Sequence, residues 1–565
     1  MDDYLPDILE ALLGYDPFVK TAAVKEKFKP FIHQQDSIQR FIDNDGQIIM
    51  AHGTGSGKTF SSIFAFEAGR QAGIAKKALV VVPAGLRTNY AEKGIKKATD
   101  DTYQVFGSKS EVAEGTHVDT KSLNKDATYS IVSYNMFRKD PTAYMEATGA
   151  DTLIGDEIHK AKSPHSTTYK ALMTARGMAR NFIGLTGSVV SNKPADIVTL
   201  LNLAAGWPVA GTQTQFDRRY VQVIGSRTGF LGGKKDVKRI IRPEEIQARF
   251  GKIVHFVGHD DLDPAMFPKK NVSEILVEMS PEQRELYDFA LGELPFWVRK
   301  RIRSGLPVGK EEAQHIFGKI IQARQAANSI HTMKATPLHL AAERTPKIRR
   351  VLDDAKNHLK TTPDGQVVMY SNLVTGGIDV LAAGLRKRKV SFGVFVGKGR
   401  EIAGMQVDEE SRQKDVESYL SGDIKVLLVS GAGAEGLDLK NTTMVQMVDG
   451  HFNPEVIQQA EARGRRAGGL AHRPPERRFV AVKRYKSVMP KPGFWESLFK
   501  DKEYTTDQWI YGVAGEKGRL TQQFRQALKG EKVDRPQVPR GFKPKKYKRR
   551  WRVFAQGKPE WRYQY

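Results

Sequence analysis

A glycine-rich loop at residues 52–59 holds the first residues of this chain that could do chemistry. It reads His-Gly-Thr-Gly-Ser-Gly-Lys-Thr and lies between the apolar pair Ile48-Ile49 and a helical pattern that begins at Phe60. A glycine loop between a strand and a helix predicts a phosphate site. Glycines let backbone N–H groups approach phosphate oxygens, and the helix N-terminus adds a positive dipole end.

Two side chains of this loop have specific expected tasks. Lys58 is expected to reach the terminal phosphates of a nucleotide, and the Thr59 hydroxyl is expected to bind Mg²⁺. The remaining expected nucleotide contacts are Gly53, Thr54, Gly55, Ser56 and Gly57. The strict pattern has glycine where this chain has His52. A glycine-rich turn without a ligand is the alternative, and the spacing Gly-x-Gly-Lys-Thr after a strand favours the phosphate site.

A second group of chemical residues follows the apolar segment 151–155. The sequence Asp156-Glu157-Ile158-His159 has the pattern of a DExH box. Asp156 is expected to hold the Mg²⁺ that Thr59 also contacts, Glu157 to orient and deprotonate the attacking water, and His159 to sense the γ-phosphate. Acid pairs at strand ends are often merely solvated. The order of this pair after the phosphate loop favours nucleotide hydrolysis.

Parallel strands are needed to position these loops. Apolar, β-branched runs predict strands at 78–82, 130–134, 152–155 and 182–188, alternating with helices. This alternation predicts a doubly wound α/β lobe with its ligand at the carboxyl ends of the strands. A second strand–helix series begins near Lys347 and has no phosphate loop. The expected fold class is therefore α/β with two parallel-sheet lobes.

Charge and composition restrict the partners. The 565 residues have a formal net charge of +25, which is large for an enzyme of small metabolites and predicts a polyanionic partner. The absence of cysteine excludes disulfides, Cys-ligated zinc and thiol catalysis. The N-terminus is acidic and no apolar run reaches the length of a membrane span. We expect no signal peptide, no membrane partner, and a location in the cytoplasm or, for a viral protein, in the host cytoplasm or virion.

Several further motifs resemble those of one family. From about residue 28 to about 520, the chain resembles helicase superfamily two, and most closely its Swi/Snf-like double-stranded DNA translocases. The matching segments are 33–34 (glutamine motif), 82–90 (motif Ia), 132–134 (motif Ib), 185–202 (motif III, with Val189 in place of a proline), 279–287 and 320–328 (helices of the middle region), 366–371 (motif IV), 426–439 (motif V) and 458–466 (motif VI).

The resemblance extends the expected site to the second lobe. Arg463 and Arg466 are three residues apart and would project from one helical face, where they could meet a phosphate bound to the first lobe. The alternative for these arginines is a basic helix face that binds nothing. The resemblance also implies ATP and Mg²⁺ as cofactors, and further nucleotide contacts from Gln34, Gly436, Asp438 and Gln459.

The same resemblance implies two RecA-like lobes, a helical insertion between them and a basic C-terminal tail. The expected domains are an N-terminal segment (1–27), the first lobe (28–204), the helical insertion (205–345), the second lobe (346–515) and the tail (516–565). From Arg540 onward the tail interleaves basic and aromatic residues, a composition that suits contact with nucleic acid. Nuclear targeting or solubilising charge are the alternatives for the tail.

Together these features predict an ATP-dependent translocase that acts as a monomer on double-stranded DNA. It would contact mostly the phosphate backbone and displace or remodel bound complexes, including protein cargo. One alternative is a helicase that separates DNA or RNA strands. Another is a virion or nucleoprotein component that uses the fold as a basic clamp. The chain resembles a nearly bare motor, which suits a bacterial or viral source.

Overall fold

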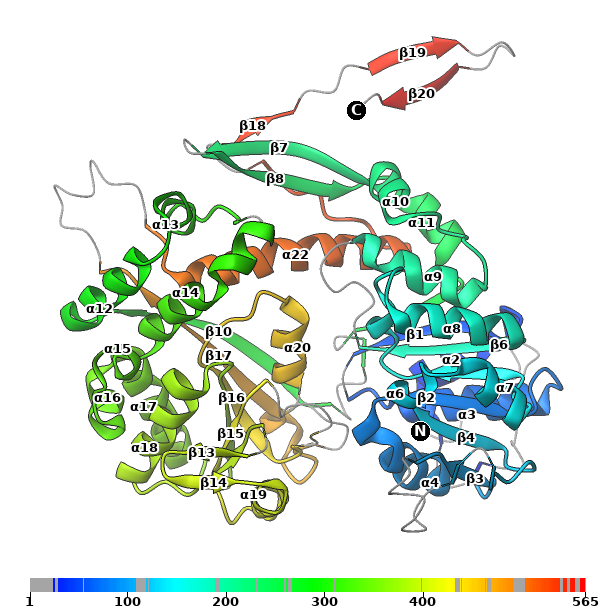
Figure 1. Ribbon diagram of the computed structural model, residues 1–565, viewed down its shortest axis with the longest axis horizontal. Helices are drawn as coiled ribbons and strands as arrows, with labels where there is room; N and C mark the ends of the chain where they lie inside the picture. The colour runs from blue at the N-terminus through cyan, green and yellow to red at the C-terminus, as the bar shows by residue number, and fades with distance from the viewer. Residues whose placement is uncertain are drawn as a thin grey trace.

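The structure of the protein is a computed structural model, and it describes most of the chain after residue 23. The described residues are 24–25, 29–53, 55–107, 118–119, 121–187, 194–229, 232–258, 261–262, 267–308, 310–397, 399–431, 437, 439–462, 464, 469–490, 503–538, 542–545, 549–553 and 559–563. Two parallel sheets dominate this part of the chain, and each is the centre of one lobe (Figure 1).

The first lobe is built on a seven-stranded sheet whose neighbouring strands are all parallel. In sheet order its strands are β3 (Tyr103–Val105), β4 (Tyr129–Ser133), β2 (Ala78–Val82), β5 (Thr152–Gly155), β6 (Asn181–Thr186), β1 (Gln47–His52) and β9 (Val254–Val257). Ile49 and Val81 enter one core cluster, whereas Ile48 and Val80 enter another. Because side chains alternate across a strand, both faces of the sheet are buried, and this is why the strands read as continuous apolar runs.

Helices cover the two faces of this first sheet. The cluster on one face includes residues of α2 (Ile32–Asp43) and α3 (Lys58–Gln71). The cluster on the other face includes residues of α7 (Pro141–Thr148), α8 (Thr167–Met178) and α9 (Ile197–Ala205). The lobe therefore has the doubly wound architecture that brings ligands to the carboxyl edge of a sheet.

The second lobe repeats this plan with a six-stranded parallel sheet. Its strands in sheet order are β10 (Lys269–Glu278), β17 (Phe479–Val488), β16 (Thr442–Met447), β11 (Gln366–Tyr370), β15 (Val426–Val429) and β12 (Phe392–Phe395). The main covering helices are α16 (Leu338–Arg344), α17 (Pro346–Thr361) and α18 (Asp379–Lys387) on one face, and α19 (Glu409–Ser421) and α20 (Pro454–Ala462) on the other. The two sheets confirm the predicted α/β fold class.

The segment between the lobes is less helical than the sequence suggested. Its helices include α10 (Gln213–Tyr220), α11 (Pro243–Phe250), α12 (Pro281–Gly292), α13 (Phe296–Arg303) and α14 (Lys310–Asn328). It also contains the hairpin strands β7 (Val221–Gly229) and β8 (Gly232–Ile240), and it supplies β9 to the first sheet and β10 to the second. The expectation of a helical insertion at 205–345 is therefore incomplete, and the domain bounds stay a prediction.

One long helix, α22 (Thr506–Lys529), touches the cores of both lobes. It begins beside the second lobe, where Tyr511 packs in the core, and it ends in the first lobe, where Phe524 packs 5.7 Å from Phe216 between ring centroids. Thr505 caps its first turn, and Gly530 ends it in the left-handed conformation. The expected tail boundary at residue 516 falls inside this helix.

The end of the chain returns to the hairpin. Strand β18 (Lys543–Pro544) pairs with β7, so that β18, β7 and β8 form a three-stranded antiparallel sheet above α22 in Figure 1. Strands β19 (Arg549–Val553) and β20 (Pro559–Tyr563) form a separate hairpin. Among the described residues, no helix combines the length and the apolarity that a bilayer crossing requires.

Candidate nucleotide site

The predicted phosphate loop connects β1 to α3 at the carboxyl edge of the first sheet. Gly55 and Gly57 have φ angles of +88° and +83°, a left-handed region in which glycine avoids the strain of a side chain. Gly57 is the N-cap of α3, and Lys58 is the first residue of that helix. Thr54 lies outside the described residues. The loop therefore presents the N-terminus of a 14-residue helix, as expected for a phosphate cradle.

His52, at the position where the strict pattern has glycine, lies at the end of β1 and is buried. A strand residue needs no positive φ, so the loop does not require glycine there. Its Nε2 lies 3.0 Å from Nδ1 of His255 on β9, and the Ser37 hydroxyl lies 2.8 Å from the same Nδ1. Burial, followed by the nearby His255, lowers the pKa of His52 well below its usual value, so that this side chain is neutral near pH 7.

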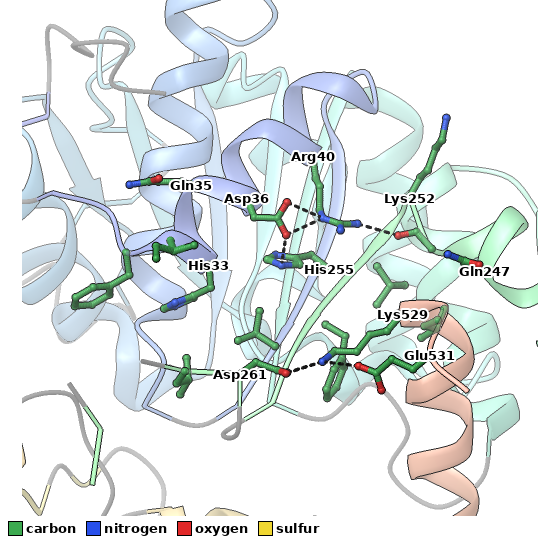
Figure 2. A pocket seen from close by; sticks show the side chains of 18 of the residues that line it. His33, Gln35, Asp36, Arg40, Gln247, Lys252, His255, Asp261, Lys529 and Glu531 are labelled. Atoms are coloured by element: carbon green, nitrogen blue, oxygen red, sulfur yellow. Dashed lines mark hydrogen bonds and ion pairs between the residues drawn. The ribbon is translucent and has the colours of Figure 1, made fainter. Parts of the chain in front are cut away.

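This buried polar cluster continues to the surface through His255. The His255 Nε2 lies 2.8 Å from the Asp36 carboxylate, which also accepts from the Arg40 side chain at 3.1 Å (Figure 2). His33, Asp36 and His255 line a cavity of about 1270 Å³. Sequence reasoning missed this cluster because His255 lies 203 positions after His52 and no local pattern links the histidines. The unusual residue His52 was the single available signal.

Two residues at the start of α2 hold the phosphate loop. The His33 Nε2 donates to the Ser56 carbonyl at 2.9 Å, and the Gln34 side-chain amide donates to the Gly57 carbonyl at 3.3 Å. The Gln34 Oε1 accepts from the Phe31 backbone N–H at 2.9 Å. The structure therefore brings the predicted Gln34 together with the loop. The amide nitrogen and the amide oxygen of Gln34 therefore each have a hydrogen-bond partner. These two bonds fix the orientation in which the side chain could contact a nucleotide base.

Lys58 extends along its own loop. Its ammonium donates to the carbonyls of His52 and Gly53 at 3.1 and 3.4 Å. Its positive charge also acts on Asp156 and Glu157, since it favours the ionised form of both carboxyls. Thr59 is the next residue of α3. The lysine and the two acids thus belong to one electrostatic cluster, although Asp156 lies 98 positions after Lys58 in the sequence.

The acid pair follows β5 in a strained turn. Glu157 has a φ of +53°, which is costly for a residue with a side chain. The Asp156 Oδ1 accepts from the Glu157 backbone N–H at 2.9 Å. The His159 Nδ1 lies 3.1 Å from the Glu157 Oε2 and 3.5 Å from the Thr186 hydroxyl at the end of β6. The turn therefore aims both carboxylates and His159 at the same edge of the sheet.

The pKa values of the two acids shift in opposite directions. Burial, followed by the neighbouring charge of Glu157, raises the pKa of Asp156. Burial alone would also raise the pKa of Glu157, but the contact with His159 and the charge of Lys58 outweigh it, and the pKa of Glu157 is lowered. Glu157 is thus the carboxylate of the pair that stays ionised, while Asp156 would be favoured in its ionised form by a nearby cation.

The donor atoms suit a magnesium ion. The Thr59 hydroxyl and the Asp156 carboxylate are hard oxygen donors, and Mg²⁺ typically takes one or two protein oxygens beside phosphates and waters. Among the described residues no group of three or more His, Cys, Asp or Glu side chains forms a protein cage for a metal. A hydroxyl and one carboxylate therefore fit an ion that arrives together with a phosphate ligand.

The predicted residues of the second lobe are only partly described. Gly436, Asp438, Arg463 and Arg466 lie outside the described residues. Gln459 is half-buried on α20, which carries it on the second lobe, whereas the phosphate loop is on the first. Two residues further, Glu461 is buried and pairs with Arg484 at 2.6 Å and with Lys270 at 3.5 Å. These ion pairs fix α20 to β17 and β10, and sequence reasoning did not identify them.

Comparison with known proteins decides the family. The SNF2-related domain matches residues 33–332, and the helicase conserved C-terminal domain matches residues 349–468. The chain belongs to the SNF2-related family. This SNF2-family chain is an ATP hydrolase of helicase superfamily two, which confirms the predicted family and the predicted enzyme class.

Individual relatives are distant. The chain is 23% identical to a protein of Acanthamoeba polyphaga mimivirus named "Putative ATP-dependent RNA helicase", over 84% of this chain and 92% of the viral protein. It is 24% identical to the DNA repair and recombination protein RAD54 of Oryza sativa, over 77% of this chain and 48% of that protein. The Sulfolobus solfataricus SWI2/SNF2 ATPase core in complex with dsDNA aligns over 90% of this chain and 98% of its own, with 17% identity and a TM-score of 0.37.

Proposed function

We propose that this ATPase moves along double-stranded DNA and displaces or remodels complexes bound to the duplex. The observation that carries the proposal is the electrostatic cluster of Lys58, Asp156 and Glu157 at the carboxyl edge of the first sheet. The second lobe has a parallel sheet but no phosphate loop. One hydrolysis site beside a second lobe is the arrangement that lets ATP change how two lobes lie against each other.

In the first lobe each residue of the cluster has a proposed task. Glu157, ionised at neutral pH and held by His159, orients the attacking water and accepts its proton. Lys58 leaves its loop carbonyls to neutralise the terminal phosphates. Thr59 and Asp156 hold Mg²⁺, which neutralises charge on the phosphate oxygens when it is bound. Gln34, already hydrogen-bonded to the loop, contacts the base from α2.

The second lobe is proposed to complete the site. Arg463 and Arg466 would stabilise the charge of the transferring phosphoryl group, and such arginines are worth about 10³ to 10⁵ in rate in related enzymes. The remaining proposed nucleotide contacts of this lobe are Gly436, Asp438 and Gln459. ATP then holds the lobes together, and hydrolysis releases them.

The net charge of the chain and the name of one relative favour DNA as the polymer along which the enzyme moves. A net charge of +25 favours a polyanion, and contacts to its phosphate backbone carry little sequence information, as a moving enzyme needs. The rice relative is named a DNA repair and recombination protein. In this proposal the chain acts as a monomer, and DNA-bound protein is its cargo.

A strand-separating RNA helicase is the second candidate. It is favoured by one observation, the name of the mimivirus relative, which matches this chain over 84% of its length.

Steady-state ATP hydrolysis would separate these candidates. The purified chain is assayed without nucleic acid and with duplex DNA, single-stranded DNA or duplex RNA, and Glu157→Gln serves as the blank. Stimulation chiefly by duplex DNA is the expected result. Stimulation chiefly by RNA or by single strands would favour the helicase proposal over the translocase proposal. ATP hydrolysis at the same rate with and without every nucleic acid would contradict both proposals.

A further inference from the structure

The three-stranded sheet β18-β7-β8 lies outside both lobes and is fixed on one side. Its hairpin follows α10 and precedes α11, and in Figure 1 it extends above α22. The Ile240 backbone N–H donates to the Gln523 side chain of α22 at 2.9 Å. Lys235 pairs with Glu516 of the same helix at 3.0 Å, and Val237 is buried. The inner face of the sheet, with Lys235 and Val237, therefore rests on α22.

A glycine lets the end of the chain dock on this sheet. Gly225 of β7 lies opposite both Val237 of β8 and Pro544 of β18. A Cβ atom at Gly225 would lie 2.7 Å from the side chain of Val538, so a larger residue there would displace the returning chain. Beyond β18, the Lys545 backbone N–H donates to the Ile224 carbonyl at 3.0 Å and prolongs the pairing. The C-terminal strand is thus an integral part of the sheet.

The outer face of the sheet gathers lysines from two distant parts of the sequence. Side chains alternate across a strand, and register partners share a face. Since Val237 and Pro544 belong to the inner face, their neighbours Lys238, Lys543 and Lys545 belong to the outer face. All three lysines are exposed. More than 300 residues of sequence separate Lys238 from Lys543, and the fold alone brings them onto one surface.

This outer face has little negative charge to balance its cations. Asp236 is the acid on the same face, and it accepts a hydrogen bond from Ser226 at 2.9 Å. Residues 540–553 contain no Asp or Glu. Within the described part of the chain, none of the three lysines takes part in an ion pair. Like charges held on one rigid sheet repel each other, and a polyanion lying across them would relieve that repulsion.

We propose that this outer face is a contact for the phosphate backbone of duplex DNA outside the two lobes. The inference rests on the proposed function and adds a second binding surface to it. A duplex is favoured over a single strand because protein surfaces that bind single strands combine cations with aromatic rings on which the bases stack. Strands β7, β8 and β18 contain no aromatic residue. A face of lysines without such rings meets phosphates and reads no bases.

The anchoring of this surface predicts when it binds. The sheet is attached to α10 and α11 and rests on α22, and none of its described contacts involves the phosphate loop. Its grip on DNA therefore persists whether or not ATP is bound. Such a contact would keep the enzyme on the duplex during the part of the cycle in which the lobes release it.

The test is the salt dependence of duplex DNA binding by Lys238→Ala/Lys543→Ala/Lys545→Ala in the full chain without nucleotide. The binding constant falls as salt rises, and each lost phosphate contact makes the slope of log K against log salt less steep by about 0.9. The triple variant is therefore expected to make the slope less steep by about 2.7. Its ATP hydrolysis without DNA is expected to be unchanged. The matched control is Lys356→Ala/Lys360→Ala/Lys414→Ala, which removes the same charge from exposed positions of α17 and α19, far from the sheet in Figure 1.

A second variant tests the surface without changing its charge. Gly225→Val should displace the C-terminal strand and reproduce at least the share of the slope that Lys543 and Lys545 contribute. An unchanged slope in the triple variant, or the same loss in the α17 and α19 control, overturns the inference. A loss confined to single-stranded DNA or to RNA also overturns it. If instead the wild-type chain binds no duplex DNA, it is the proposed function that fails.

Discussion

The two lobes place acidic residues at equivalent edges of parallel sheets but use them differently. In the second lobe, Asp449 follows β16 and is almost completely hydrogen-bonded. It accepts from the Ser371 hydroxyl, from the backbone N–H and side-chain amide of Asn372 at 3.1 and 3.0 Å, and lies 3.6 Å from Arg324. In the first lobe, Asp156 follows β5 and accepts one backbone N–H, from Glu157.

The backbone shows the same contrast. Glu157 has a left-handed φ of +53°, and burial raises the pKa of its neighbour Asp156. Asp449 has no positive φ, so its backbone is outside the left-handed region. A buried acid with a full set of donors stabilises the fold, whereas a buried acid in a strained turn with few donors has capacity left for a ligand. This difference distinguishes the chemical lobe from the supporting one.

The largest effect is expected from Lys58→Ala. Removing this ammonium takes away the charge that balances the terminal phosphates and both acids, so ATP turnover should fall to background. Steady-state hydrolysis measures the loss, and an unchanged Tm shows that the fold is intact. Lys76→Ala, at an exposed position of the same lobe, is the control. Retained turnover would mean that the chemistry is not centred on this loop.

Glu157→Gln should reduce ATP turnover by about 10²- to 10⁴-fold, the usual worth of a general base. The amide keeps the shape of the side chain but cannot accept the proton of the attacking water. ATP binding should persist, and the affinity for duplex DNA should respond to ATP even though turnover is slow. Equilibrium binding with and without ATP checks this. If the affinity of this variant for duplex DNA is the same with and without ATP, the proposed coupling between ATP binding and lobe closure is wrong.

Asp449→Asn should instead act on stability. Breaking a buried charge pair by changing one partner typically costs about 3 to 5 kcal/mol, and Arg324 would remain buried without its carboxylate. We expect a lower Tm and unchanged ATP affinity in the molecules that remain folded. Glu417→Gln, at an exposed position of α19, provides the comparison. A fall in ATP affinity at normal Tm would place Asp449 among the chemical residues and weaken the contrast between the lobes.

Glu67 on α3 tests whether burying a carboxyl in the first lobe lowers the stability of the folded state. Burial raises its pKa to about 7, despite hydrogen bonds from Tyr129 at 2.5 Å and Arg70 at 2.7 Å. A carboxyl whose pKa is higher in the folded state is ionised more easily in the unfolded state. The folded state therefore loses stability as the pH rises from about 4.5 to above 7, by at most roughly 3 kcal/mol.

Glu67→Gln should remove this part of the pH dependence. Denaturation at pH 5 and pH 8 measures it, with the variant changing less than the wild type over that interval. A wild type that is equally stable at both pH values, or a variant that keeps the full loss, would show that Glu67 is already well solvated or fully paired.

Local sequence patterns were sufficient for the first lobe's central strands and its two chemical turns. β1, β2, β4, β5 and β6 are apolar runs, and the residues that follow β1 and β5 have strong local signatures. β10 was missed because most of its residues are exposed, and its single apolar run is only three residues long, Ile275 to Val277. The contact between His52 and His255 was missed because it joins strands whose pairing no local pattern encodes.

The second lobe was predicted mainly through its resemblance to a family. Its strands could be found by their apolar runs, but the partners of Asp449 are the residues that directly follow β11 and Arg324 of α14, which are far apart in sequence. Whether an acid at a strand end has its donors is a property of packing in three dimensions. The sequence could therefore indicate where acids stand but not which of them are fully hydrogen-bonded.

In the proposed cycle, helix α22 would limit how far the two lobes could separate. Its 24 residues span about 36 Å, and its first turn is tied to α17 by the buried pair of Lys347 and Asp507, 2.6 Å apart. Its other end is embedded in the first lobe. The helix contains Gly512, Gly515 and Gly518, and each glycine weakens a helix by about 1 kcal/mol relative to alanine. The lobes could separate only as far as α22 bends. The bend is expected first at the three glycines, where the helix is weakest.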